Sequence, residues 1–120
     1  MSEIGQRMRN DKPADEALQG ALAECRVQID SIDRDILASL NRRTKVVEEI
    51  GRIKQNFKAA VYEPKREEEV YRNVTANNHG PLPHDAVRRI FERIIDEMRT
   101  IQKQRQQQAR PETDQGGRQS

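Results

Sequence analysis

Apolar side chains recur every three or four residues along the first half of the chain, which is the spacing of one face of an α-helix. The pattern runs from residue 18 to residue 54 without a proline, so it predicts one helix from about Glu16 to Gln55. At about 1.5 Å per residue this helix would be on the order of 60 Å long. Its apolar positions are Leu18, Leu22, Cys25, Ile29, Ile32, Ile36, Leu40, Val47 and Ile50.

Two shorter helices are predicted in the second half of the chain. Pro64 suits a helix start and opens a helix from about Lys65 to Ala76. Residues 77–83 contain a glycine and two prolines, a composition typical of a turn. A third helix follows from about His84 to Lys103, and no segment alternates as a β-strand would. The inward positions of the third helix are Val87, Phe91, Ile94, Ile95 and Met98.

The first helix is too long for this chain to bury its apolar stripe. Only 33% of the 120 residues are hydrophobic and 3% are aromatic, so two short helices offer it little apolar surface. A second copy lying alongside is the simplest solution, which predicts an all-α, intertwined homodimer with three helices per chain. Residues 1–15 and 104–120 lack helical periodicity and are predicted to be disordered extensions of a domain at 16–103.

Charge and cysteine content exclude several classes of protein. Residues 16–102 hold fifteen cations and fifteen anions, so a basic nucleic-acid-binding surface is not expected. No run approaches the roughly 18 apolar residues of a membrane span, and residues 1–19 carry no export signal. A lone Cys25 excludes a disulfide framework. We therefore expect a soluble, cytoplasmic protein that binds neither nucleic acid nor membrane.

Two steps of the apolar stripe are occupied by cations, Arg43 and Lys54. An uncompensated cation in a low-dielectric interior is costly, so it is normally paired or turned toward a cavity that holds an anion. The alternative is that the stripe rotates around the helix and both side chains extend to water along their apolar stems. The pattern alone leaves both interpretations open.

Other polar residues lie on or beside inward faces of the two shorter helices. Gln102 continues the apolar line of the third helix, and Arg66 and Glu67 open the second. Each also has an ordinary explanation, because Gln102 would suit a frayed helix end and Arg66 and Glu67 a first helical turn. His79 and His84 have no cysteine or acidic group at metal-ligand spacing, so no metal site is predicted.

Arg26 lies seventeen residues before Arg43, about 25 Å away along the same helix, and cannot reach the same pocket within one chain. In an antiparallel dimer, Arg26 of the partner subunit would lie beside Arg43. Three guanidinium groups and one ammonium group around a cavity suit a small ligand with two carboxylates. Alternatively, Arg26 is a solvated charge paired with Asp30.

The unusual positions also form an ordered set along the chain: Cys25-Arg26, Ile29-Asp30, Ile32-Asp33, Leu40-Asn41-Arg42-Arg43, Ile50-Gly51-Arg52-Ile53-Lys54, Tyr62-Glu63-Pro64-Lys65-Arg66-Glu67, Asn78-His79-Gly80-Pro81-Leu82, and Ile90-Phe91 through Gln102. In this order they resemble the chorismate mutases of the all-helical class. The resemblance covers residues from about 18 to 103, and its specificity lies in the combination of widely separated charged positions.

The resemblance implies an intertwined dimer with two active sites, each of which takes one arginine from the neighbouring subunit. Arg26 of the partner subunit and Arg43 would hold the two carboxylates of chorismate, with Arg66 assisting. The reaction would be the intramolecular Claisen rearrangement of chorismate to prephenate, on the route to phenylalanine and tyrosine. It requires neither a covalent intermediate nor a cofactor.

The same resemblance assigns the remaining polar residues. Lys54 and Gln102 would hydrogen-bond the ether oxygen, where negative charge builds as the bond breaks. Glu67 would accept a hydrogen bond from the ring hydroxyl, and Glu63 lies near that hydroxyl, where the family often has Asp. The expected catalytic residues are thus Lys54, Gln102 and Arg43, and the others bind substrate.

Two further functions remain open at this stage. A lyase of the same fold releases pyruvate from isochorismate, although the approach Tyr62-Glu63-Pro64 to Arg66 and Glu67 resembles the mutase more closely. A helical dimer without activity would instead act as a regulatory or partner-binding module, for example in a complex with another shikimate-pathway enzyme. The retained charged positions argue against an inactive site.

Overall fold

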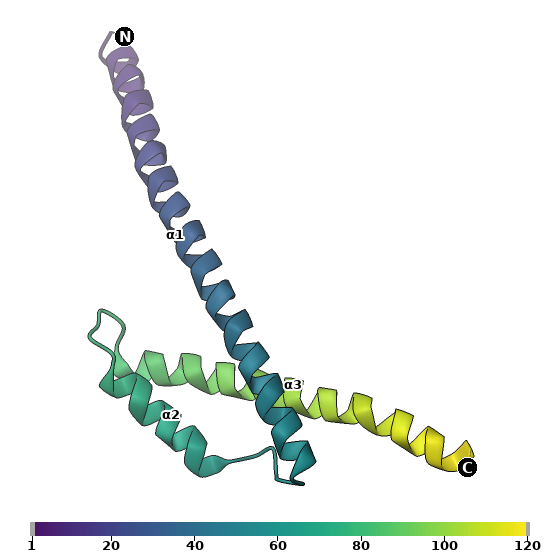
Figure 1. Cartoon of the computed structure of the whole chain (residues 1–120). Coiled ribbons are helices and arrows are strands. Elements are labelled where there is room, and N and C mark those ends of the chain that lie inside the picture. The colour runs from purple at the N-terminus through teal and green to yellow at the C-terminus, as the bar shows by residue number, and fades with distance from the viewer. Residues whose placement is uncertain (1, 120) are drawn as a thin grey trace. The chain divides into compact units, whose positions relative to one another are not determined.

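The computed structural model describes the backbone of residues 2–119 and the side chains of residues 13–108. Three α-helices follow one another, α1 (Ser2–Asn56), α2 (Pro64–Ala76) and α3 (His84–Gln119) (Figure 1). Within this described backbone there is no β-strand. The predicted all-α fold with three helices and a very long first helix is confirmed. None of the described helices is both long and apolar enough to cross a membrane.

The helix limits inside the chain agree with the sequence pattern to within one residue. α1 ends at Asn56, α2 begins at Pro64, and α3 begins at His84. Pro64 occupies the first turn of α2, where its missing N–H leaves no hydrogen bond unmade.

At the outer ends of the chain, α1 and α3 extend beyond the predicted limits. Residues 104–108 contain four glutamines and one arginine, which are good helix formers, so nothing there ends α3 locally. The extensions predicted to be disordered, 1–15 and 104–120, lie mostly outside the residues whose side chains are described. Their disorder stays a prediction.

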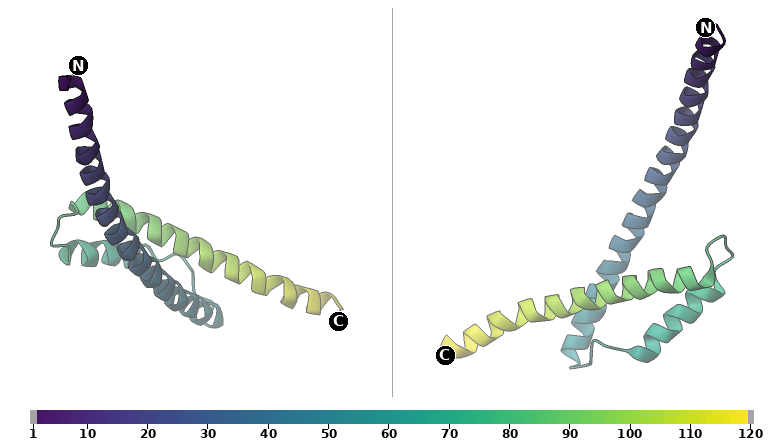
Figure 2. Two further views of the ribbon diagram at one scale, coloured as in Figure 1. Left: turned by 90° about the horizontal axis from the view of Figure 1, so that it is seen from above. Right: turned by 180° about the vertical axis from the view of Figure 1, so that it is seen from behind.

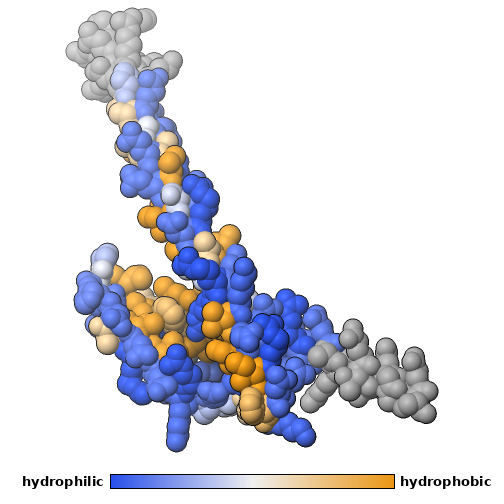
Figure 3. Space-filling view, in the orientation of Figure 1, coloured by the Kyte–Doolittle hydropathy of each residue, from blue (hydrophilic) through white to orange (hydrophobic). Residues whose placement is uncertain are grey.

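The chain divides into two units, residues 1–42 and residues 43–120. The described backbone of the first unit belongs to the earlier part of α1, and none of its described side chains is buried. Apolar side chains along this unit therefore face solvent in the single chain (Figure 3). Those that are more than half exposed are Leu18, Val27, Ile29, Ile32, Ile36 and Leu37.

In the second unit, the last turns of α1 pack with α2 and α3. α2 and α3 lie side by side and are joined by residues 77–83 (Figures 1 and 2). The end of α1 is held to α3 by polar contacts, among them Arg105 Nε to Glu48 Oε2 at 2.8 Å. The core is small, and its buried apolar side chains are Tyr71, Val87, Ile95 and Met98.

α1 ends in a left-handed turn that fixes the position of its last side chains. The Ala59 N–H donates to the Lys54 carbonyl at 2.7 Å, and the Lys58 N–H donates to the Gln55 carbonyl at 3.2 Å. This pair of hydrogen bonds defines a Schellman motif. Lys58 has a φ of 55°, at the position where glycine is usual because a side chain there is strained.

The predicted turn between α2 and α3 is also present. Asn78 organises it, because its Nδ2 donates to the Leu82 carbonyl at 2.8 Å and its Oδ1 accepts from the Gly80 N–H at 3.0 Å. Gly80 has a φ of 79°, which glycine adopts without the strain that a Cβ would cause.

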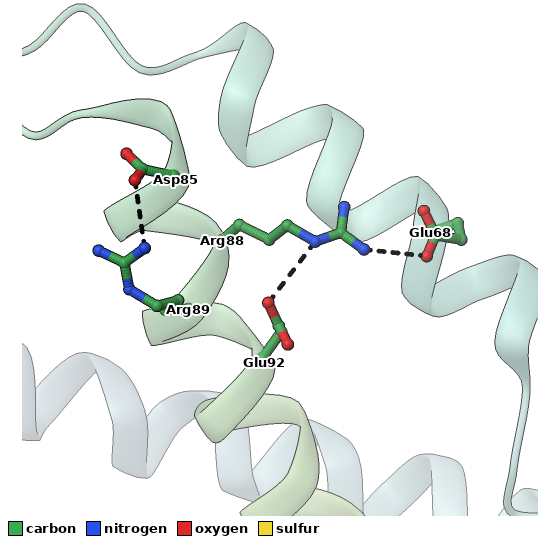
Figure 4. A network of polar contacts seen from close by, with 5 residues as sticks. All are labelled: Glu68, Asp85, Arg88, Arg89 and Glu92. Atoms are coloured by element: carbon green, nitrogen blue, oxygen red, sulfur yellow. Dashed lines mark hydrogen bonds and ion pairs between the residues drawn. The ribbon is translucent and has the colours of Figure 1, made fainter.

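A polar network joins α2 to the first turns of α3 (Figure 4). The Arg88 guanidinium lies 4.3 Å from the centroid of the Tyr71 ring, and it contacts Glu68 at 3.2 Å and Glu92 at 3.5 Å. Stacking and ion pairing together therefore connect the two helices at this end.

Replacing Lys58 by glycine is expected to stabilise the chain by up to about 1 kcal/mol, because only the lysine is strained in the left-handed turn. Urea unfolding followed by circular dichroism measures the change. Lys58→Val should destabilise by a similar amount or more, since a β-branched residue is least tolerated there. A less stable Lys58→Gly variant would contradict this interpretation of the turn.

Candidate functional site

A cavity of about 370 Å³ lies within the second unit, lined by the end of α1, by α2 with the residues before it, and by α3. This volume is typical of sites for small molecules. Figure 3 shows apolar side chains gathered between α2 and α3. The apolar lining consists of Val46, Val47, Ile50, Val61, Val70, Ile95 and Met98.

The polar lining carries more positive than negative charge. Four cations and two carboxylates face the cavity, which leaves a formal excess of two positive charges, and the neutral amide of Gln102 completes the lining. A cavity with this excess attracts a dianion. The charged residues are Arg43, Lys54, Arg66, Arg99, Glu63 and Glu67.

Arg43 is the least compensated of these cations. Its guanidinium makes no ion pair or hydrogen bond with the part of the chain that the structure describes. Burial, and then the charge of Arg66, lower the pKa of Arg43 from its usual value. Both effects disfavour the charged form, and the opposite charge of a bound anion would counteract them.

Lys54 is held in place from two sides. Its Nζ donates to the Val61 carbonyl at 2.9 Å and pairs with Glu63 Oε1 at 2.8 Å, and only 12% of its side chain is exposed. Glu63 precedes α2 as its N-cap residue but makes no side-chain cap. An ammonium group has three N–H donors, so one remains for a ligand.

Gln102 is fixed in the same way from α3. The residue is 8% exposed, and its Nε2 donates to the Val47 carbonyl at 3.0 Å, which leaves the second N–H of the amide. The Gly51 backbone lies close to this side chain and leaves space for a methyl group, since a Cβ at that position would lie 3.7 Å from Gln102 Cγ. The end of α1 therefore sets the orientation of the amide.

The two residues that open α2 differ in their surroundings. Arg66 pairs with Glu69 at 3.5 Å, and both side chains are more than half exposed. Glu67 is 20% exposed and pairs with Arg99 at 2.5 Å. The hydrogen bond with Glu67 raises the pKa of Arg99 above its usual value.

Six of the seven residues expected from the sequence line this one cavity: Arg43, Lys54, Glu63, Arg66, Glu67 and Gln102. The seventh, Arg26, belongs to the first unit, is exposed, and does not line it. Its contribution from a partner subunit stays a prediction. No group of three or more His, Cys, Asp or Glu among the described residues is arranged to hold a metal ion.

Sequence analysis missed Arg99. This residue follows Ile95 by four positions and precedes Gln102 by three, so it continues the inward face of α3. The same signal, a cation at an apolar step of a helix, identified Arg43 and Lys54 and would have identified Arg99 as well.

A protein-family model and two solved structures match this chain. The family model described as chorismate mutase type II matches residues 25–103. Among solved structures, form II of chorismate mutase from Thermus thermophilus has a TM-score of 0.67 and 34% sequence identity, over 68% of this chain and 93% of that one. Form I from the same organism has a TM-score of 0.62 and 36% identity, over 64% and 96% of the respective chains.

Two curated relatives are bifunctional chorismate mutase/prephenate dehydratases. The protein from Neisseria gonorrhoeae is 39% identical over 75 residues, which is 62% of this chain and 20% of the relative. The protein from Aquifex aeolicus is 34% identical over 86 residues, which is 68% of this chain and 24% of the relative. The chain therefore spans between a fifth and a quarter of the length of these relatives.

Gly51→Ala is expected to fold and to raise stability by about 0.5–1 kcal/mol, because the new methyl group makes ordinary contact with Gln102 and alanine favours a helix. Gly51→Leu should instead lower stability, since its larger side chain would displace Gln102 from the Val47 carbonyl. Thermal unfolding of both variants measures the difference. A destabilised Gly51→Ala variant would show that the space beside Gln102 is tighter than described.

Proposed function

The chain belongs to the chorismate mutase type II family, and from this premise we propose that it rearranges chorismate to prephenate in the cavity of the second unit. The observation that carries the proposal is the charge of the lining. Chorismate has two carboxylates, the cavity has an excess of two positive charges, and Arg43 lacks a compensating anion among the described residues. The substrate carboxylates would supply the compensating charge.

Arg43 and Arg66 are proposed to hold the substrate carboxylates. Arginine binds a carboxylate through two parallel N–H donors, which fixes orientation as well as position. The rearrangement joins two carbon atoms of one flexible molecule, so a clamp that favours the compact conformer lowers the barrier. Arg66, now paired only with the exposed Glu69 among the described residues, is able to turn toward a ligand at low cost.

Lys54 and Gln102 are proposed to act on the ether oxygen. Each has one N–H donor engaged by a backbone carbonyl, from Val61 and Val47 respectively, and each keeps at least one N–H for a ligand. Because their positions are fixed before substrate binds, they would stabilise the charge that develops on the oxygen without rearranging.

The chemistry needs no proton transfer. The ether C–O bond breaks as the new C–C bond forms, and substrate and product have the same atoms. Glu67 would accept a hydrogen bond from the ring hydroxyl through its oxygen that Arg99 does not occupy, with Glu63 nearby. An acceleration of about 10⁶ corresponds to about 8 kcal/mol, which orientation and two fixed donors can supply.

A homodimer is proposed to complete the site. The apolar stripe of the first unit is uncovered in the single chain, and a second copy would bury it. We propose that Arg26 of the partner subunit then joins Arg43 at the substrate carboxylates. The proposed setting is the cytoplasm, with a complex with another shikimate-pathway enzyme as a further option.

Purified protein is expected to convert chorismate to prephenate, because all residues proposed for catalysis line one cavity. Loss of chorismate absorbance with identification of the product measures this, and the same assay on isochorismate serves as the comparison. Pyruvate release from isochorismate without prephenate formation would assign the lyase reaction instead. Inactivity on both would favour a partner-binding module.

The control for this assay is the pair Lys54→Ala and Lys45→Ala, both on α1. Lys54→Ala should lower kcat by roughly 100-fold to 1,000-fold, the usual effect of removing a fixed donor to developing charge. Lys45 is exposed and does not line the cavity, so Lys45→Ala should leave kcat unchanged. Near-normal turnover by Lys54→Ala would contradict the proposed role of Lys54 as a donor to the ether oxygen.

Mixing two inactive variants tests the shared site. Arg26→Ala and Arg43→Ala, unfolded together in equal amounts and refolded, should recover about a quarter of wild-type activity, because half the dimers are mixed and one of their two sites is intact. The control mixture of Arg43→Ala and Lys54→Ala should recover none, since both residues belong to the same subunit's half of the site. No recovery in the first mixture would contradict a partner's role for Arg26.

A further inference from the structure

Arg99 is the charged residue of the cavity wall that has no role of its own in the proposed function. It lies on α3 between Ile95 and Gln102, and its side chain is 26% exposed. Its Nη2 pairs with Glu67, and its guanidinium lies 5.0 Å from the centroid of the Tyr62 ring. A contact from α2 and a contact from the segment before α2 thus both hold the Arg99 side chain.

The surroundings of Arg99 leave one of its donors unsatisfied. Its Nε is buried without a hydrogen-bond partner, the only such side-chain nitrogen or oxygen atom among the described residues. A buried donor without a partner is unfavourable, and a partly buried ion pair often stabilises a fold no more than apolar side chains of similar size. Fold stability alone therefore does not explain an arginine at this position.

Contacts with the protein already engage several parts of the Arg99 guanidinium. The buried Nε is inaccessible, Nη2 is engaged by Glu67, and Nη1 lies 3.6 Å from Asp96. The aromatic ring of Tyr62 lies against one face of the guanidinium. The shorter of its two ion pairs is the one with Glu67, a carboxylate that also lines the cavity.

We propose that Arg99 is a positioning residue that orients the Glu67 carboxylate for the ligand. This inference rests on the proposed function, in which Glu67 accepts a hydrogen bond from the substrate hydroxyl. Arg99 occupies Oε2 of Glu67 and leaves Oε1 for that hydroxyl, while Tyr62 fixes the plane of the guanidinium. Because one oxygen is already engaged, the carboxylate is restrained before substrate arrives.

The test is a double-mutant cycle on chorismate turnover with Arg99→Met and Glu67→Gln. Arg99→Met should lower kcat/KM by about tenfold to a hundredfold, as expected for a group that orients another. Added to Glu67→Gln, it should cause less than about a twofold further loss, because its effect passes through Glu67. The double variant should unfold at a temperature no lower than wild type, since both charges are gone.

Two further variants separate positioning from structure. Arg99→Lys keeps the charge beside Glu67 and should recover part of the activity that Arg99→Met loses. Arg88→Met is the matched control, because Arg88 also lies on α3, stacks on a tyrosine and pairs with α2, but does not line the cavity. It should retain wild-type kcat/KM.

The outcomes distinguish this inference from the proposed function. Wild-type turnover with an unaffected Arg99→Met variant, or losses that multiply fully in the double variant, would overturn the inference alone. Failure of both Arg99→Met and Arg99→Lys to fold would assign the residue to stability and overturn it as well. A wild-type protein inactive on chorismate would overturn the proposed function and the inference with it.

Discussion

The excess of positive charge in the cavity is the constraint on which the rest of this site depends. Four cations are gathered around a partly apolar space, and two carboxylates compensate only half of them. Burial, and then the like charge of Arg66, lower the pKa of Arg43, because both disfavour its charged form. A dianionic ligand would compensate this excess, so the charge arrangement favours the binding of a dianion.

The carboxylates of the cavity each pair with one cation, and the pairing restrains both side chains. Glu63 and the Val61 carbonyl fix Lys54, and Glu67 pairs with Arg99. Each pairing uses part of the donors or acceptors available and leaves the rest for a ligand. Donors fixed in this way lose little freedom in the transition state, which is the condition for effective electrostatic catalysis.

Helix positions and most of the site were predictable because they follow from local spacing. The cations Arg43 and Lys54 interrupt an apolar stripe, so the helical repeat places both on the inward face of α1. Gln102 continues the apolar line of α3, and the packing of the two helices brings it to the same cavity. The turn at residues 77–83 was equally local, since glycine, proline and asparagine each set its backbone.

Other features depend on contacts that a linear pattern does not contain. The left-handed turn at Lys58 lacks the glycine that usually marks it, and Tyr71 becomes buried because Arg88 and α3 cover it. The role of Arg99 depends on Glu67 and Tyr62, more than thirty residues earlier. Whether Arg26 reaches the cavity depends on a second chain, which neither the spacing nor the single chain determines.

A crystal structure of the protein with prephenate tests the central claim most directly. The account predicts a dimer in which prephenate fills the cavity of the second unit, with its carboxylates on Arg43 and on Arg26 of the partner subunit. Glu67 should remain paired with Arg99 and accept the product hydroxyl. Prephenate bound elsewhere, or bound in this cavity without contact to Arg43, would contradict the account.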